Sequence, residues 1–309
     1  MGISHYPNGF ANGVSILGMP VLNAYAGDVY WVNSATGSNG NKGTRDRPFS
    51  TLDYAIGRCT ANNGDVIMVM PNHAETITGA GGITADVAGI TIVGLGTFNQ
   101  RPRFLMDGAT TVSFVISAAD VTVQNLVFAS GHADVVTCFD VTGVGATLVG
   151  LEFVNNVVDE NFVTEVKATG TDNTADGLTV IGCRAYTVDA AGAEFLEVTG
   201  DLNALTFQNN FISKDAGTAA GAILCATGKD LTNCLITNNY LISGATSGAL
   251  FVNSDTAANS GIVADNRIGH HDTAAAVPID LSGARIFQNY ALGVDDASGL
   301  LLPAVDDNA

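Results

Sequence analysis

Three carboxylate residues recur in a sequence context that could support chemistry on a polysaccharide. Asp140, Glu165 and Glu197 each precede a valine. Successive side chains of a strand point to opposite faces, so these carboxylates are expected to point outward while their valine neighbours point inward. In strands stacked on successive coils, adjacent carboxylates would lie about 5 Å apart and the outer two about 10 Å apart. These separations bracket those between the two carboxyl groups of retaining and inverting glycosidases.

Several functions are open for this row of carboxylates. Like charges at such distances repel unless water, a cation or a shared proton relieves them. A solvated row, or a row buried at a seam between subunits, is the leading interpretation. A cation site is one alternative, and the catalytic site of a polysaccharide hydrolase or lyase is another. No cofactor and no resident metal are expected. Residues 172–177 lack the alternating oxygen ligands and closing glutamate of a calcium loop and are expected to form a turn.

The elements that would position these residues form a repeat. Short apolar segments ending in Gly, Asn or Asp recur about every 28 residues, with a second strand-like segment inside each unit. The central residues of the first segments are Ile92, Val123, Leu148, Val180, Phe207, Ile236, Val263 and Ile286. Units of this length with strands and no helical period are typical of a parallel β-helix, in which each coil stacks on the previous one. A leucine-rich repeat would need a helical half in each unit, and none is visible.

One turn position changes along the repeat. The third residue after the central one is apolar or cysteine in the earlier units and asparagine in the later ones, at Asn210, Asn239, Asn266 and Asn289. Equivalent residues of stacked coils lie about 4.8 Å apart, so each side-chain amide can bond the next. Asparagine also tolerates the left-handed backbone of a sharp corner. The sequence therefore predicts an asparagine ladder in the later coils.

The two ends differ from the middle. Residues 1–27 show no strand period and are expected to form an extended arm, whereas residues 48–57 are predicted to form a helix that covers the first coil with Leu52, Ala55 and Ile56. The expected boundaries are 28–88 for the capping segment and first coil, 89–290 for the β-helix and 291–309 for a tail. The arm is too apolar for a free tail, so it is expected to become ordered on a partner surface. Its candidate attachment residues are Tyr6, Phe10, Ile16, Leu17, Val21 and Leu22.

Charge and composition exclude several partners. The 309 residues include 12 Lys+Arg and 30 Asp+Glu, for a net charge of −18. Nucleic acids and anionic membranes attract basic proteins, so neither is an expected partner. The apolar runs are all shorter than the roughly 18 residues of a spanning helix, and no secretion signal is expected at the N-terminus. The five cysteines are an odd count without a CxxC pair and are expected to be buried free thiols.

Two stretches resemble known proteins. The segment Gly40-Asn-Lys-Gly-Thr-Arg-Asp-Arg-Pro-Phe-Ser-Thr-Leu-Asp-Tyr-Ala-Ile56, together with residues 64–76, resembles the opening segment of right-handed parallel β-helix proteins of the pectin-lyase-like class. Residues 6–21 resemble the N-terminal arm of bacteriophage virion proteins that carry a short β-helix. The fold expected from the repeat and from this resemblance is all-β, a single-stranded right-handed parallel β-helix with an extended arm and a capping helix.

The resemblance implies a structural and non-enzymatic role. It implies a homotrimer that is assembled in the host cytoplasm and decorates the virion as a cement or head-fibre protein, attached through its arm to the major capsid protein or other virion proteins. A tail-spike-like protein that binds or cleaves bacterial surface polysaccharide is the alternative. A secreted carbohydrate-active enzyme is a third class, which the N-terminal sequence disfavours.

Overall fold

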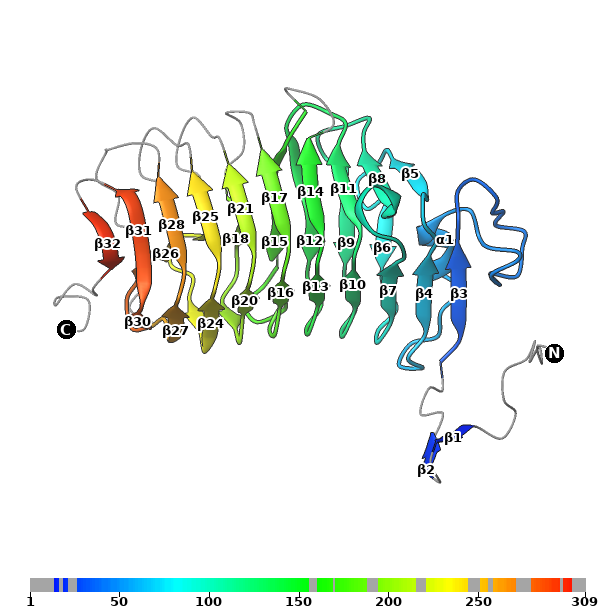
Figure 1. Ribbon diagram of the computed structural model, residues 1–309, viewed down its shortest axis with the longest axis horizontal. Helices are drawn as coiled ribbons and strands as arrows, with labels where there is room; N and C mark the ends of the chain where they lie inside the picture. The colour runs from blue at the N-terminus through cyan, green and yellow to red at the C-terminus, as the bar shows by residue number, and fades with distance from the viewer. Residues whose placement is uncertain are drawn as a thin grey trace.

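The computed structural model shows an elongated parallel β-solenoid, in which coils of three strands stack along one axis (Figure 1). It describes residues 14–16, 19–21, 27–155, 160–168, 170–187, 194–214, 221–243, 251–254, 258–270, 279–294 and 297–301. Three parallel sheets run the length of the stack, and the predicted all-β parallel β-helix is confirmed.

Each sheet contains one strand from each coil. The first sheet contains β3 (Val29–Val32), β4 (Val66–Val69), β7 (Thr91–Gly94), β10 (Thr122–Gln124), β13 (Thr147–Val149), β16 (Thr179–Ile181), β20 (Thr206–Gln208), β24 (Cys234–Thr237), β27 (Gly261–Ala264) and β30 (Arg285–Phe287). The second contains β5 (Ala74–Ile77), β8 (Arg103–Met106), β11 (Val127–Ser130), β14 (Glu152–Asn155), β17 (Arg184–Thr187), β21 (Phe211–Lys214), β25 (Tyr240–Ser243), β28 (Arg267–His270), β31 (Asn289–Val294) and β32 (Ala297–Leu301). The third contains β6 (Ile83–Ala85), β9 (Phe114–Ile116), β12 (Val135–Val141), β15 (Phe162–Ala168), β18 (Leu196–Val198), β22 (Ile223–Cys225), β26 (Val252–Ser254) and β29 (Ile279–Leu281).

The strand register confirms the repeat. The eight central residues predicted from sequence pair in order along the first sheet, from Ile92 with Val123 to Val263 with Ile286. All of them point into the core, and Ile286 alone among them is only partly buried. Aromatic rings stack through the earlier coils, where Phe104 lies 5.4 Å from Phe128 and Phe114 lies 4.8 Å from Phe139 between ring centroids. Inward-facing side chains of successive coils therefore form one continuous apolar core.

The capping helix is confirmed as α1 (Leu52–Ile56), which buries Leu52, Ala55 and Ile56. The Thr51 hydroxyl does not cap the helix; instead the Leu52 N–H donates to Glu75 Oε2 at 3.0 Å. The first strand of the first sheet, β3, precedes the capping helix in the sequence and pairs with β4, which follows the helix. A short 3-10 helix, η1 (Phe98–Gln100), and the small pair β19 (Leu202–Asn203) and β23 (Leu231–Thr232) complete the body.

The arm differs from the prediction of a segment without strands. β1 (Val14–Ile16) and β2 (Met19–Val21) form an antiparallel hairpin, apart from the solenoid in Figure 1. Only two residues separate these strands in sequence, the commonest spacing of hairpins, and such short strands are too brief to show a clear alternation. Of the candidate attachment residues, Ile16 and Val21 lie in the hairpin, and Tyr6, Phe10, Leu17 and Leu22 lie outside the described residues.

The C-terminal boundary expected after residue 290 falls inside β31, which pairs with β32 in an antiparallel hairpin. This hairpin continues the second sheet beyond the last coil.

The cysteines are all free. Four are buried, as predicted, and Cys59 is half-buried. Desolvation raises the pKa of the Cys59 and Cys183 thiols to about 12, so these thiols stay protonated at neutral pH. No helix among the described residues is long and apolar enough to cross a membrane.

Candidate functional site

The predicted row of three carboxylates is not present. In the register of the third sheet, Asp140 pairs with Lys167, and Lys167 pairs with Glu197. The outward row is therefore acid, base, acid, and Lys167 Nζ lies 2.7 Å from Glu197 Oε2. The prediction placed Glu165 two residues out of register. Because side chains two apart in a strand share a face, such a slip preserves the alternation that the prediction used.

Glu165 lies instead in a closed polar cluster. Its Oε2 is 2.7 Å from Lys214 Nζ, and both side chains are inaccessible to solvent. Lys214 also donates to the carbonyl oxygens of Glu194, at 2.8 Å, and Val163, at 3.3 Å. Burial raises the pKa of Glu165 to about 7 even though Lys214 acts in the opposite direction. An acid enclosed in this way cannot reach a polysaccharide, so the geometry assigns Glu165 to the stability of the fold.

The asparagine ladder is confirmed. Asn239 Oδ1 accepts from the main-chain N–H of Asn210 at 2.9 Å and from its Nδ2 at 3.0 Å. Asn239 bonds Asn266 in the same way, and Asn266 bonds Asn289. All four side chains are buried. The sequence left open a left-handed backbone at the ladder asparagines themselves, but these residues do not adopt it. The residue before each of them does, and at Asn209 and Asn238 φ is 57°.

A second row, which the sequence analysis missed, lies directly after the ladder on the second sheet. We call it the arginine–aromatic row. Its members point outward in consecutive register and are Arg103, Val127, Glu152, Arg184, Phe211, Tyr240, Arg267 and Tyr290. The signal was available in the sequence, because each ladder asparagine is followed by one of Phe211, Tyr240, Arg267 and Tyr290.

The side chains of this row contact one another along the stack. The Arg184 guanidinium lies 5.5 Å from the centre of the Phe211 ring, over its face. The Phe211 and Tyr240 rings stack at 5.4 Å with an angle of 8° between their planes. Two hollows of about 520 and 440 Å³ adjoin the end of the row, and Tyr240, Arg267 and Tyr290 line both. A flat ring array beside a cation is thus open to a ligand.

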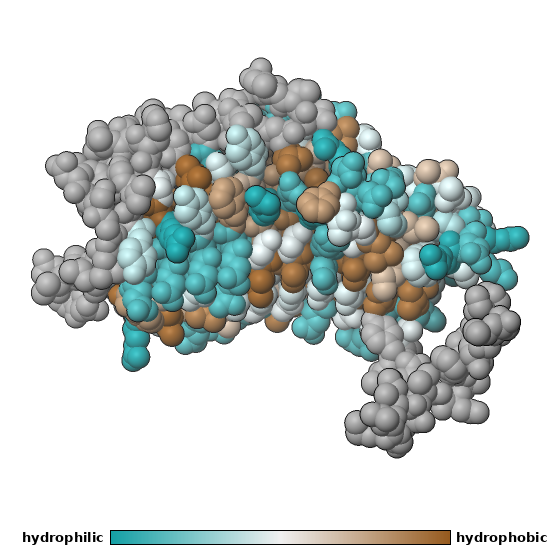
Figure 2. All heavy atoms as spheres, viewed as in Figure 1, coloured by the Kyte–Doolittle hydropathy of each residue, from teal (hydrophilic) through white to brown (hydrophobic). Residues whose placement is uncertain are grey.

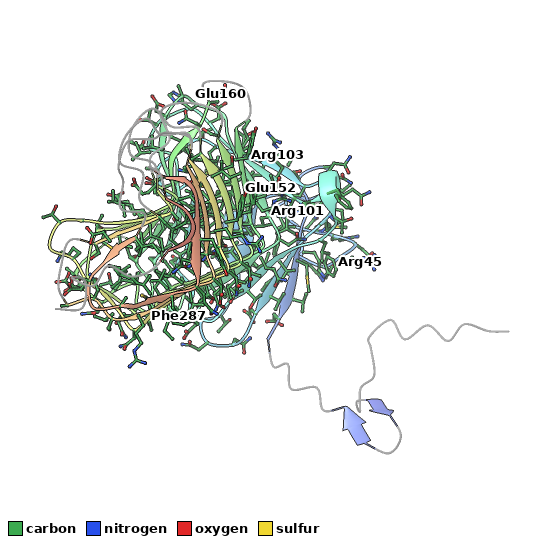
Figure 3. All side chains as sticks on the ribbon, turned by 60° about the vertical axis from the view of Figure 1, so that its left-hand side comes forward. Arg45, Arg101, Arg103, Glu152, Glu160 and Phe287 are labelled. Atoms are coloured by element: carbon green, nitrogen blue, oxygen red, sulfur yellow. The ribbon has the colours of Figure 1, made fainter. Side chains whose placement is uncertain are left out.

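The other end of the row is fixed by an ion pair. Arg101 Nη1 lies 2.7 Å from Glu152 Oε2, and Arg101 Nη2 donates to the carbonyl oxygens of Gly150 and Leu126. Figure 3 shows Arg101, Arg103 and Glu152 together on this side of the solenoid. They line a third hollow of about 440 Å³ that also reaches Arg184. This hollow continues the row toward β8.

The first sheet has a contrasting outer surface, which we call the uncharged face. Its ten strands contain a single charged residue, Arg285, in the last of them. Five threonines of its outer surface stand in register from Thr91 to Thr206. The neighbouring outward row includes Val93, Val149 and Ile181. Figure 2 shows this surface over β7–β16 as largely white and brown, with little of the teal of hydrophilic residues.

These features define the chain as a parallel β-solenoid protein with one uncharged sheet face and one arginine–aromatic row. Among the described residues, no group of three or more His, Cys, Asp or Glu is placed to hold a metal ion. No family model matches the chain, and no curated protein matches it.

Solved structures of other β-helix proteins are similar in fold. A rhamnogalacturonan lyase matches with 14% identity and a TM-score of 0.43, over 88% of this chain and 86% of that one. The GH136 lacto-N-biosidase from Eubacterium ramulus, as its selenomethionine derivative, matches with 12% identity and a TM-score of 0.40, over 85% of this chain and 67% of that one. The native form of the same protein matches with 11% identity and a TM-score of 0.32, over 85% and 68%.

Proposed function

We propose that the chain is a structural, non-enzymatic virion protein that forms a homotrimer and decorates the capsid. The uncharged face is the observation that carries this proposal. A chain with a net charge of −18 that leaves one whole sheet almost free of charge has a surface suited to burial in an assembly. The centres of protein interfaces are depleted of charged residues. The partner for this face is a second copy of the chain, and the arm attaches the trimer to the major capsid protein or another virion protein.

A charge placed on the uncharged face tests the homotrimer. The substitution Val149→Glu, at the middle of the face, is expected to convert the trimer into 31.6 kDa monomers, because three carboxylates would be desolvated at the interface. The measurement is the mass in solution by light scattering. Val127→Glu makes the same change on the second sheet and is expected to leave the trimer intact. A monomeric wild-type protein, or a trimeric Val149→Glu variant, would contradict the proposed interface.

Deletion of the arm tests the attachment. A chain without residues 2–24 keeps β3 and all later coils, so it is expected to fold and to keep its melting temperature within a few degrees. It is expected to be lost from purified particles, with its occupancy measured by quantitative mass spectrometry against the capsid protein. Normal occupancy of the truncated chain would show that the solenoid, and not the arm, is the anchor.

Binding of bacterial surface polysaccharide is a second candidate function, and the arginine–aromatic row favours it. Aromatic rings and a few placed polar groups are the usual lining of ligand sites. The row favours binding over cleavage, because Glu197 is paired with Lys167 and Glu165 is enclosed with Lys214.

A further inference from the structure

The arginine–aromatic row concentrates positive charge on an acidic chain. The protein has eight arginines, and three of them, Arg103, Arg184 and Arg267, point outward from this one row. All three are exposed. The chain as a whole, with a net charge of −18, repels anions. A local array of guanidinium groups therefore determines where on its surface an anionic ligand binds.

The spacing of the row suits a polymer more than a small molecule. Arg184 and Arg267 are separated by two aromatic residues in register, Phe211 and Tyr240, and therefore lie about 14 Å apart along the stack. Tyr290 continues the row one coil further. A ligand that contacts both arginines must run along the solenoid axis and pass the stacked rings of Phe211 and Tyr240 between them.

The chemistry of these side chains defines the class of ligand. A guanidinium presents paired donors whose planar geometry matches a carboxylate. Exposed aromatic rings such as those of Tyr240 and Tyr290, 38% and 49% accessible, offer flat amphipathic surfaces on which sugar rings pack. The hollows on either side of Arg267 give space for substituents of such a chain.

We propose that the arginine–aromatic row binds an acidic polysaccharide whose sugars carry carboxylate groups. Arg184 and Arg267 pair with carboxylates of the polymer, and the exposed Tyr240 and Tyr290 pack against its rings. This inference rests on the second candidate function, binding of polysaccharide, and adds the chemical class of the ligand.

Calorimetric titration of the full chain with defined oligosaccharides tests the inference. The acidic probes are oligomannuronate, oligogalacturonate and a hyaluronan oligosaccharide. The neutral probe is β-1,4-mannan oligosaccharide, which has the mannuronate backbone without its carboxylates. The wild-type protein is expected to bind at least one acidic probe at least tenfold more tightly than the neutral one, and binding is expected to weaken at high salt.

Three variants locate the binding. Arg267→Gln and Tyr240→Ala are each expected to lower the affinity for the acidic probe that the wild type binds, at least tenfold. Arg58→Gln, at an exposed arginine beyond α1, makes the same change in net charge and is expected to bind as the wild type does. Since all three side chains are exposed, their melting temperatures are expected to match the wild type.

The outcomes separate the two levels of the proposal. The wild type could bind mannan as tightly as oligomannuronate and lose both in Tyr240→Ala. The row would then remain a polysaccharide site, but the proposal that its ligand carries carboxylates would be overturned. Absence of binding to all four probes would overturn both. Equal losses in Arg58→Gln and Arg267→Gln would show a general effect of charge and would overturn the row as the site.

Discussion

Replacing Lys214 with methionine is expected to lower the free energy of unfolding by about 3 to 5 kcal/mol well above pH 7, where Glu165 is ionised in the wild-type protein. The substitution leaves Glu165 fully buried without the ammonium that lies 2.7 Å from its carboxylate. It also removes the donor to the carbonyl oxygens of Val163 and Glu194. Urea denaturation followed by circular dichroism measures the loss.

Two further variants control this result. Lys167→Met removes a lysine from an ion pair of equal length, with side chains 26% and 27% exposed, and is expected to cost less than about 1 kcal/mol. In Lys214→Met with Glu165→Gln the buried charge is absent, so most of the lost stability is expected to return. A Lys214→Met protein as stable as Lys167→Met would contradict the structural role assigned to the pair.

The dependence on pH has a definite sign. Burial raises the pKa of Glu165 from 4.5 to about 7, so the folded state binds this proton more tightly than the unfolded state. The contribution of Glu165 to stability is therefore complete below pH 4.5 and is lost as the pH rises to about 7. Without Lys214, which lowers this pKa, the decline is expected to extend to higher pH in Lys214→Met. Its slope should approach about 1.4 kcal/mol per pH unit and vanish when Glu165 is also replaced.

Replacing Asn239 with alanine is expected to lower the free energy of unfolding by about 3 kcal/mol or more. Four buried groups lose a partner: the main-chain N–H and the Nδ2 of Asn210, the Oδ1 of Asn266 and the carbonyl oxygen of Phe207. Each unsatisfied buried group costs about 1 to 3 kcal/mol, and relaxation of the turn recovers part of the sum. Thermal and urea denaturation measure the loss.

Asn99→Ala is the matched control for this prediction. Asn99 lies exposed in η1, so its replacement is expected to change stability by less than about 0.5 kcal/mol. A loss below about 1 kcal/mol in Asn239→Ala would mean that water satisfies the turn equally well and that the ladder does not stabilise the coils.

Sequence periodicity predicted those positions that hold the same type of side chain in successive coils. The central residues of the first sheet and the ladder asparagines recur with one role in each coil, so the alignment of repeats located them correctly. The position of Glu165 could not be found in this way, because a two-residue slip in a strand leaves the pattern of apolar residues unchanged. Its pairing with Lys214 joins two sheets and has no signature in either segment alone.

The arginine–aromatic row could not be predicted for a different reason. Its members differ in type from coil to coil, so the position that holds Arg184, Phe211 and Tyr240 in successive coils shows no repeat in the sequence. What these residues share is their place after a corner, which becomes visible only once the register is known. The hairpin of the arm was missed because its strands have three residues each.

The distribution of phenylalanine and asparagine along the stack divides the solenoid into two halves with different responses to temperature. Apart from Phe251, the fully buried phenylalanine rings lie in the coils before β21, whereas the bonded asparagines hold the coils from β20 onward. Apolar burial weakens on cooling, while hydrogen bonds between amides do not share that dependence. Since each coil contacts mainly its neighbours, the two halves can lose structure separately. The phenylalanine-rich half is therefore expected to be the more sensitive to cold, and the asparagine-bonded half is expected to retain its structure to lower temperature.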